Sequence, residues 1–295
     1  MATVREVLAE TARRLAEVTE SPEFDAALLA AHAWGWNRTR LIMNASEVAD
    51  TAALEPLVLR RLAHEPVAYI LGNWEFFSLE FDLAPPLLVP RPETEHLVEV
   101  ALEFLGVRTG RVLDLCTGTG CVILSIAKNA RGGVWWATDL NPLAVSTARA
   151  NAVLHAIDLT LVEGDLFAPI PREVAPFDVI VSNPPYVEDG DWEGLAPDIR
   201  HYEDPLALLS GNDGLDCIRR IVAEAAGWLA PGGLLALEMG ECQGTALRGL
   251  LERAGYEDIK ITKDLAGHDR IASGRRPISF TTKPTKSSRG PGSKD

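Results

Sequence analysis

The chain has 295 residues, of which 47% are hydrophobic, and this composition excludes a protein that is mainly disordered. Lys and Arg number 28 against 42 Asp and Glu, a formal net charge of -14 that disfavours direct contact with nucleic acid and favours a protein partner. The sequence has no leader pattern, no membrane span and no paired C-x-x-C spacing, so we expect a cytoplasmic protein without a metal site or a disulfide framework.

The first 72 residues have the periodicity of a small helical domain. Apolar residues recur at helical spacing over Val4–Val18, and Ser21 followed by proline is typical of a helix start, with the second helix ending near Trp34. A further helix is expected over Pro56–His64. From this periodicity we predict an all-helical domain over residues 1–72. No catalytic motif lies in it.

A change to strand periodicity follows the helices. Phe77, Leu79, Phe81 and Leu83 alternate with polar residues, which is the spacing of a β-strand with one buried face. We therefore predict a β-hairpin linker over residues 73–90.

The remaining sequence has the pattern of a mainly parallel sheet. Apolar runs rich in β-branched residues alternate with helical segments over residues 91–281, which indicates an α/β fold built from βαβ units. Residues 282–295 carry no apolar anchor and are predicted to be disordered. The predicted strands are Arg111–Leu115, Val134–Thr138, Thr160–Val162, Asp178–Ser182, Gly233–Leu237 and Glu257–Thr262, with a last strand at either Arg270–Ser273 or Ile278–Thr281.

The segment after the first of these strands has the features of a nucleotide-binding loop. The buried strand runs into Thr117-Gly118-Thr119-Gly120-Cys121, and a helical stretch follows. The two glycines let the backbone adopt positive φ and approach a ligand, while the amides of the helix face it. A dinucleotide fingerprint would place a third glycine at Ile123, so the NAD reading is weakened. A Gly-x-Gly turn alone is more often a tight loop than a cofactor site.

Acidic residues at the next two strand ends strengthen the nucleotide hypothesis. Asp139 closes the second strand, where a carboxylate can accept hydrogen bonds from both ribose hydroxyls. Asp165 and Phe167 follow the third strand and suit the exocyclic amine and the ring face of an adenine. These features favour an adenosine-containing cofactor, but several such cofactors remain open.

The fourth strand ends in a motif that suits methylation of an amide. In Asn183-Pro184-Pro185-Tyr186, the Asn183 side-chain oxygen and the Pro184 carbonyl can each accept one N–H of a primary amide. An amide nitrogen is a poor nucleophile because its lone pair is delocalised, so positioning must do most of the catalysis. Tyr186 would pack on the planar amide. We predict direct in-line transfer of the methyl group with no metal. The alternative without a function is a proline turn that ends the strand at the surface.

At these residues the chain resembles the class I S-adenosylmethionine methyltransferases, and more narrowly the glutamine-N5 methyltransferases that modify peptide chain release factors. Phe167 stands where many relatives are expected to carry Trp, and Phe77-Ser78-Leu79 lacks an expected glycine. The matching segments are Pro66–Gly72, Glu75–Phe77, Val89–Glu95, Asp114–Gly120, Asn183–Tyr186, Gly211–Leu215, Pro231–Gly233 and Asp264–Arg270.

The resemblance implies a Rossmann-like domain with a seven-stranded, mostly parallel sheet and an N-terminal helical domain that helps to dock the release factor. It also implies the substrate, the glutamine of a Gly-Gly-Gln tripeptide, and a role in translation termination. By the same resemblance, Asn183 to Tyr186 hold the glutamine, and a set of residues binds S-adenosylmethionine: Thr117, Gly118, Thr119, Gly120, Cys121, Asp139, Phe167 and Asn183.

Three alternatives remain open at this stage. A sister branch that methylates a ribosomal-protein glutamine shares the Asn-Pro-Pro-Tyr loop, but Pro92–Glu95 favours the release-factor enzymes. A DNA adenine-N6 methyltransferase would need a basic recognition surface, which the net charge disfavours. A dehydrogenase or a non-catalytic adenosine-binding module fits Ile123 and the acceptor motif poorly. Arg91 and Glu93 could border the cofactor or form an interdomain salt bridge, Glu238 could be structural, and a monomer is expected.

Overall fold

The computed structural model describes residues 2–278, and its first part is a bundle of five helices. The Thr3 hydroxyl accepts from the Glu6 amide at 3.4 Å while the Glu6 carboxylate accepts from the Thr3 amide at 2.8 Å, which fixes the start of the first helix. Buried apolar side chains such as Val4, Leu15 and Leu29 form a core within the bundle, and Trp74 of the segment that follows packs against it. The helices are α1 (Val4–Leu15), α2 (Pro22–Trp34), α3 (Arg38–Met43), α4 (Glu55–Leu62) and α5 (Val67–Leu71).

One buried ion pair connects the helices of this bundle. Arg61 on α4 donates from Nε to the Asp25 carboxylate on α2 at 2.8 Å, and the two side chains are only 6% and 10% exposed. The same guanidinium donates to the carbonyl oxygens of Val18 and Glu65. Arg61 therefore links α2, α4 and the chain that leaves α1.

A short hairpin follows the bundle. Strands β1 (Asn73–Phe76) and β2 (Leu79–Asp82) pair antiparallel through a two-residue turn at Phe77 and Ser78, whose φ values are 51° and 61°. The Phe77 amide donates to the Glu95 carboxylate at 2.8 Å, which supports a turn that usually takes glycine. The prediction that Phe77 is a strand residue was wrong, because Phe77 occupies the turn. The domain limits at residues 72, 90 and 281 stay predictions.

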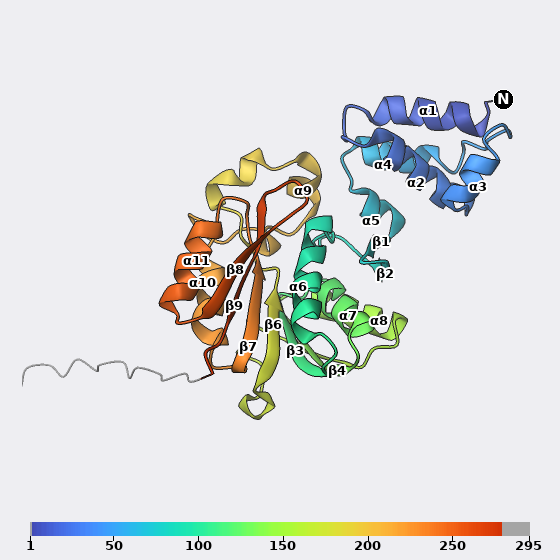
Figure 1. Ribbon diagram of the computed structural model, residues 1–295. Coiled ribbons are helices and arrows are strands. Elements are labelled where there is room, and N and C mark those ends of the chain that lie inside the picture. Colours follow the sequence, from blue (N-terminus) through green and yellow to red (C-terminus); the bar gives the residue numbers. More distant parts are fainter. Residues whose placement is uncertain (1, 279–295) are drawn as a thin grey trace, which may run out of the picture.

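The larger part of the molecule is a seven-stranded sheet covered by helices on both faces (Figure 1). The strand order is β5-β4-β3-β6-β7-β9-β8, and every neighbouring pair is parallel except those that β9 makes with β7 and β8. The strands are β3 (Gly110–Leu115), β4 (Gly133–Asp139), β5 (Leu159–Glu163), β6 (Phe177–Ser182), β7 (Leu229–Glu238), β8 (Glu257–Lys263) and β9 (Asp269–Arg275).

The predicted α/β fold is confirmed, with one antiparallel strand among seven. The last strand lies at Asp269–Arg275, so the first of its two predicted positions is right. All but the first residue of the other position, Ile278–Thr281, lies outside the described residues. The predicted tail at 282–295 lies outside the described residues. Among residues 2–278, no helix is long and apolar enough to cross a bilayer.

The two faces of the sheet hold two separate cores. One face packs against a 3₁₀ turn (Pro92–Thr94) and helices α6, α7 and α8, and the other packs against α10 and α11 (Figure 1). Parallel strands buried on both faces read as continuous apolar runs, which is why they were visible in the sequence. The helices are α6 (Glu95–Leu105), α7 (Cys121–Asn129), α8 (Pro142–Leu154), α9 (Pro197–Tyr202), α10 (Asp216–Ala225) and α11 (Gly244–Arg253).

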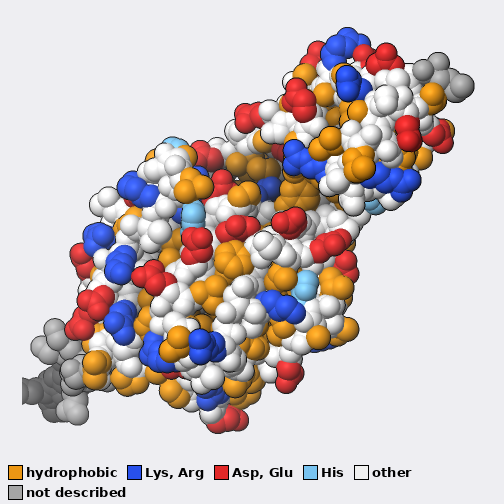
Figure 2. Space-filling model, turned by 45° about the vertical axis from the view of Figure 1, so that its right-hand side comes forward, with side chains coloured by type: hydrophobic (Ala, Val, Ile, Leu, Met, Phe, Trp, Pro, Cys, Tyr) orange, Lys and Arg blue, Asp and Glu red, His pale blue; other side chains and the backbone are white. Residues whose placement is uncertain are grey.

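A small apolar cluster joins the helical bundle to the sheet domain. Ala68 and Tyr69 of α5 share it with Leu87, Val89 and the α8 residue Ala144, and all five are at most 5% exposed. Figure 2 shows a hollow between the bundle and the larger body, with hydrophobic side chains inside it. The bundle is thus held beside the carboxyl edge of the sheet.

Candidate cofactor and acceptor site

The loops that follow β3, β4, β5 and β6 meet at one edge of the sheet and enclose a cavity of about 540 Å³. This volume lies within the roughly 300–1,000 Å³ usual for small-molecule sites. A smaller space of about 40 Å³ shares Gly118 and Asn183 with it and is also lined by Thr117, Thr119 and Cys121. Among the predicted site residues, the larger cavity brings together Gly118, Asp139, Asp165, Asn183 and Pro185.

The glycine loop after β3 is held open by hydrogen bonds to two carboxylates. The Thr117 hydroxyl donates to the buried Asp114 carboxylate at 2.7 Å, and the Gly118 amide donates to Asp139 at 2.8 Å. Gly118 has φ +57° with no atom near the position of a Cβ, so its backbone faces open space. Burial raises the pKa of Asp114 to about 7. Gly120, at φ +80°, packs against Ala148 and lines neither cavity.

Asp139 at the end of β4 lines the larger cavity, as predicted for a ribose-binding carboxylate. One oxygen accepts from Gly118 and the other accepts from the Asn141 amide at 2.9 Å. Each carboxylate oxygen has a further lone pair that a ligand hydroxyl can use. Burial raises the pKa of Asp139, and the amides that donate to it oppose that rise.

Asn151 anchors the glycine loop to the hairpin. The Asn151 side chain is fully buried on α8, donates to the Thr119 carbonyl at 2.9 Å and accepts from the Asp82 amide at 2.8 Å. No motif in the sequence marked this residue, because its two partners, Thr119 and Asp82, come from distant segments.

The segment after β5 is arranged differently from the predicted adenine site. Asp165 lines the cavity and pairs with Arg220 at 2.6 Å, so its carboxylate has a cationic neighbour. The Phe167 ring is 2% exposed and stacks on Trp228 with ring centroids 5.6 Å apart, so it belongs to the core and lines neither cavity. Two cysteines that the sequence did not single out as site residues, Cys116 and Cys217, also line the larger cavity.

Asn183 stands where the two cavities meet. Its side chain is half-buried, and Nδ2 donates to the Thr94 hydroxyl oxygen at 3.3 Å. That contact leaves the amide oxygen Oδ1 as the acceptor for a ligand. Pro185 lines the larger cavity, whereas Pro184 and Tyr186 line neither.

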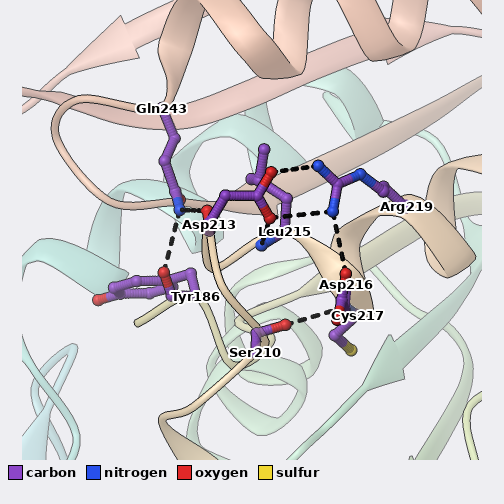
Figure 3. A network of polar contacts seen from close by, with 8 residues as sticks. All are labelled: Tyr186, Ser210, Asp213, Leu215, Asp216, Cys217, Arg219 and Gln243. Atoms are coloured by element: carbon purple, nitrogen blue, oxygen red, sulfur yellow. Dashed lines mark hydrogen bonds and ion pairs between the residues drawn. The ribbon is translucent and has the colours of Figure 1, made fainter. Parts of the chain in front are cut away.

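Tyr186 is held at both ends. Its hydroxyl donates to Glu238 Oε1 at 3.2 Å, and its carbonyl accepts from the Gln243 amide at 3.0 Å (Figure 3). The same Gln243 nitrogen donates to the Asp213 carbonyl at 3.2 Å, which ties the loop after β6 to the loop before α10. Sequence reasoning missed Gln243, since it follows β7 without any recognisable motif.

We predict that Gly214→Ala lowers turnover at least tenfold. Gly214 has φ +67°, and an added Cβ would lie against the carbonyl oxygen of Tyr186, far inside van der Waals contact. The Asn183–Tyr186 loop would have to shift, and small misplacements of positioning groups reduce rates by large factors. Steady-state kinetics and cofactor titration measure this. Gly190→Ala, at a site with open space around the Cβ position, is the control, and equal turnover in both variants would contradict the prediction.

Glu238 at the end of β7 is 1% exposed, and burial raises its pKa to about 7 from the ordinary 4.5. The folded protein therefore keeps a proton that the unfolded chain releases between these two pH values. We predict that the free energy of unfolding falls as pH rises from about 4.5 to 7, with Glu238 contributing roughly 3 kcal/mol.

Denaturant melts of the parent chain and Glu238→Gln between pH 5 and 8 measure this contribution. The difference in unfolding free energy between the two should move in favour of the variant as pH increases to about 7 and should then level off. A constant difference across that range would show that Glu238 titrates normally.

Comparison with known proteins identifies the family. The chain is 42% identical over 278 residues to a release factor glutamine methyltransferase of Burkholderia pseudomallei, covering 90% of this chain and 96% of the relative. A release factor glutamine methyltransferase of Geobacter sulfurreducens is 39% identical, with 92% and 96% covered. The chain belongs to the release factor glutamine methyltransferase family. Within this methyltransferase, residues 6–72 match the PrmC N-terminal domain and residues 93–196 match the Methyltransferase small domain.

Solved structures agree on the fold. A methyltransferase from Pyrococcus furiosus superposes with a TM-score of 0.51 at 21% identity, covering 75% of this chain and 98% of that one. The Rossmann-like methyltransferase fold predicted from the sequence is thus confirmed. Arg91 lines neither cavity. It forms an ion pair at 2.6 Å with Glu203, the residue that follows the last residue of α9.

Proposed function

We propose that this methyltransferase transfers a methyl group from S-adenosylmethionine to the side-chain nitrogen of the Gly-Gly-Gln glutamine in peptide chain release factors. The relatives at 35–42% identity, all named release factor glutamine methyltransferases, carry the proposal. The cavity beside Asn183 supports it, because an acceptor for N–H groups lines a nucleotide-sized space. The enzyme would act in the cytoplasm as a monomer and support translation termination.

The donor set of the larger cavity fits S-adenosylmethionine. Gly118 offers a backbone that a ligand can approach, and Asp139 offers free lone pairs for ribose hydroxyls. Asp165, beside Arg220, suits the adenine amine, while Leu140 and Leu166 give apolar walls. Thr117, Thr119, Gly120 and Cys121 would shape the loop, and Phe167 would support it from the core. When bound, the cofactor supplies an electrophilic methyl group.

The residues of the acceptor loop would do their work by positioning. Asn183 Oδ1 and the Pro184 carbonyl each accept one N–H of the glutamine amide, which orients the nitrogen lone pair and removes the freedom to rotate. Pro184 and Pro185 stiffen the backbone that carries these acceptors. The Tyr186 ring limits tilt of the amide, and its two anchors at Glu238 and Gln243 keep the ring in place. The nitrogen then loses its proton to solvent without a strong base.

The N-terminal helices are proposed to dock the release factor. They lie beside the carboxyl edge of the sheet, so a protein held by them can present a loop to Asn183 (Figure 1). The net charge of -14 supports a protein substrate over nucleic acid.

Labelled methyl donor, purified enzyme and a purified release factor test the proposal. Mass spectrometry should place the label on the Gly-Gly-Gln glutamine, and a release factor with Gln replaced by Ala should take up none. Ribosomal proteins and DNA serve as competing acceptors in the same assay. Label on either of those, with none on the release factor, would select a different substrate.

A further inference from the structure

Three polar side chains form a connected group behind the Asn183 amide. Thr94 Oγ1 accepts from Asn183 Nδ2 at 3.3 Å, and Tyr186 donates to Glu238 Oε1 at 3.2 Å. Ser182 and Leu237 pair in register on neighbouring strands, so Asn183 and Glu238 follow them side by side. The Thr94 hydroxyl lowers the pKa of Glu238. The exposed fractions of Thr94 and Glu238 are 2% and 1%, so water does not compete for these contacts.

One oxygen of the Glu238 carboxylate is free to accept a further hydrogen bond. Within residues 2–278, Oε2 of Glu238 is buried with no donor in full hydrogen-bonding geometry, whereas Oε1 is used by Tyr186. A buried acceptor without a partner is unfavourable, and the nearby hydroxyl of Thr94 can satisfy it. Tyr186 cannot do so while it donates to Oε1, because a phenol has one proton.

The orientation of the Asn183 amide depends on which group donates a hydrogen bond to Glu238. A carboxamide can turn over and exchange its oxygen with its nitrogen, and only one orientation presents an acceptor to the glutamine N–H. An ionised carboxylate accepts hydrogen bonds and donates none. If the Thr94 hydroxyl donates its hydrogen bond to Glu238, the Thr94 oxygen can act toward Asn183 only as an acceptor. Asn183 must then present its donor, Nδ2, to Thr94.

We propose that Thr94 and Glu238 are positioning residues that fix the Asn183 amide with its oxygen toward the acceptor glutamine. This inference rests on the proposed function and adds two residues to it. The two residues lie on separate segments, the turn before α6 and the end of β7. Glu238 lines neither cavity, and Thr94 lines only the smaller one. In this proposal both act through Asn183.

Protonation of Glu238 should weaken this control. Burial is the largest effect on Glu238 and raises its pKa to about 7. Thr94, Tyr186 and Arg270 oppose this rise, and Glu93 adds to it. A protonated Glu238 can donate to Thr94, whose own hydroxyl is then free to turn toward Asn183 and favour the inverted amide. The rate of methyl transfer should therefore increase with pH through about 7.

Thr94→Val and Thr94→Ser form the matched pair that tests the relay. Valine keeps the shape of threonine without the hydroxyl, and serine keeps the hydroxyl. We expect Thr94→Val to lower the single-turnover rate about 10- to 100-fold with cofactor Kd within about twofold, by analogy with the loss of a positioning hydrogen bond, and Thr94→Ser to restore most of it. A valine variant as fast as the parent, or a serine variant as slow as valine, overturns the inference.

Glu238→Gln supplies a readout that a purely structural role would not change. Its single-turnover rate should be lower than that of the parent chain and flat between pH 6 and 8, where the parent rate increases. A variant that keeps the parent's pH profile overturns the role of Glu238. The parent chain also separates the two proposals: absence of label on the release factor glutamine refutes the proposed function, whereas normal labelling with an unaffected Thr94→Val refutes only the relay.

Discussion

Replacing Asn183 by alanine is expected to lower turnover by about 10²- to 10³-fold, the loss seen when one fixed hydrogen-bonding group is removed from a reacting centre. Asn183 offers the side-chain acceptor at the junction of the two cavities, and alanine leaves the Pro184 carbonyl alone to hold the glutamine amide. Cofactor affinity should fall far less than turnover, by at most about tenfold, because Asn183 is one of several residues that line the cavities and the Gly118–Asp139 contact is untouched. Single-turnover kinetics and isothermal titration with S-adenosylmethionine measure the two quantities.

Asn212→Ala is the matched control for this variant. Asn212 is exposed on the loop before α10, so the same chemical change there should leave both turnover and affinity unchanged. Near parental turnover in Asn183→Ala would remove the basis for amide positioning by this loop.

Arg61→Met is expected to have the largest effect on stability. It removes the cation that faces Asp25 in the helical bundle and leaves a buried carboxylate without a charge partner, a change that costs about 3–5 kcal/mol. The bundle has its own core, so it should open while the sheet domain stays folded. Hydrogen–deuterium exchange should rise in the peptide that covers α2 and remain low in β3 and β6.

Two further variants give this prediction its controls. Asp25→Leu combined with Arg61→Met replaces the pair by apolar side chains and should recover most of the lost stability. Arg13→Met breaks a pair with Glu10 whose side chains are 75% and 54% exposed, and its effect on stability should be small because solvent screens the pair. Equal exchange in Arg61→Met and Arg13→Met would show that the Asp25 pair contributes little.

Sequence reasoning found those parts of the fold that short stretches determine by themselves. The central strands were predicted within a few residues because strands buried on both faces are continuous apolar runs that end in glycine or a polar residue. The turn at Phe77 and Ser78 was mistaken for strand, since alternation of apolar residues continues through it. Helices α3, α5 and α9 were not anticipated, because five or six residues carry too little periodicity.

In the candidate site too, contiguous motifs were predicted and residues defined by distant partners were not. The glycine loop and the Asn183–Tyr186 loop were predicted because each is a contiguous motif at a strand end. Thr94, Asn151 and Gln243 were not, since each is defined by partners dozens of residues away. The local context of Phe167 predicts a ring facing a ligand, but packing against Trp228 turns the ring into the core. That choice depends on tertiary structure and leaves no local pattern.

The apolar cluster that joins α5 to the sheet domain has a consequence for substrate selection. Leu87 and Ala144 belong both to this cluster and to the wall of the larger cavity, so the helical bundle and the cavity share a rigid boundary. For a release factor docked on the helical bundle as proposed, the separation between its anchoring point and Asn183 is then set by the enzyme. A loop whose glutamine is displaced by one residue, about 3.5 Å of extended chain, holds its amide short of the acceptors. Reach alone can therefore distinguish one glutamine from its neighbours, whatever the sequence around it.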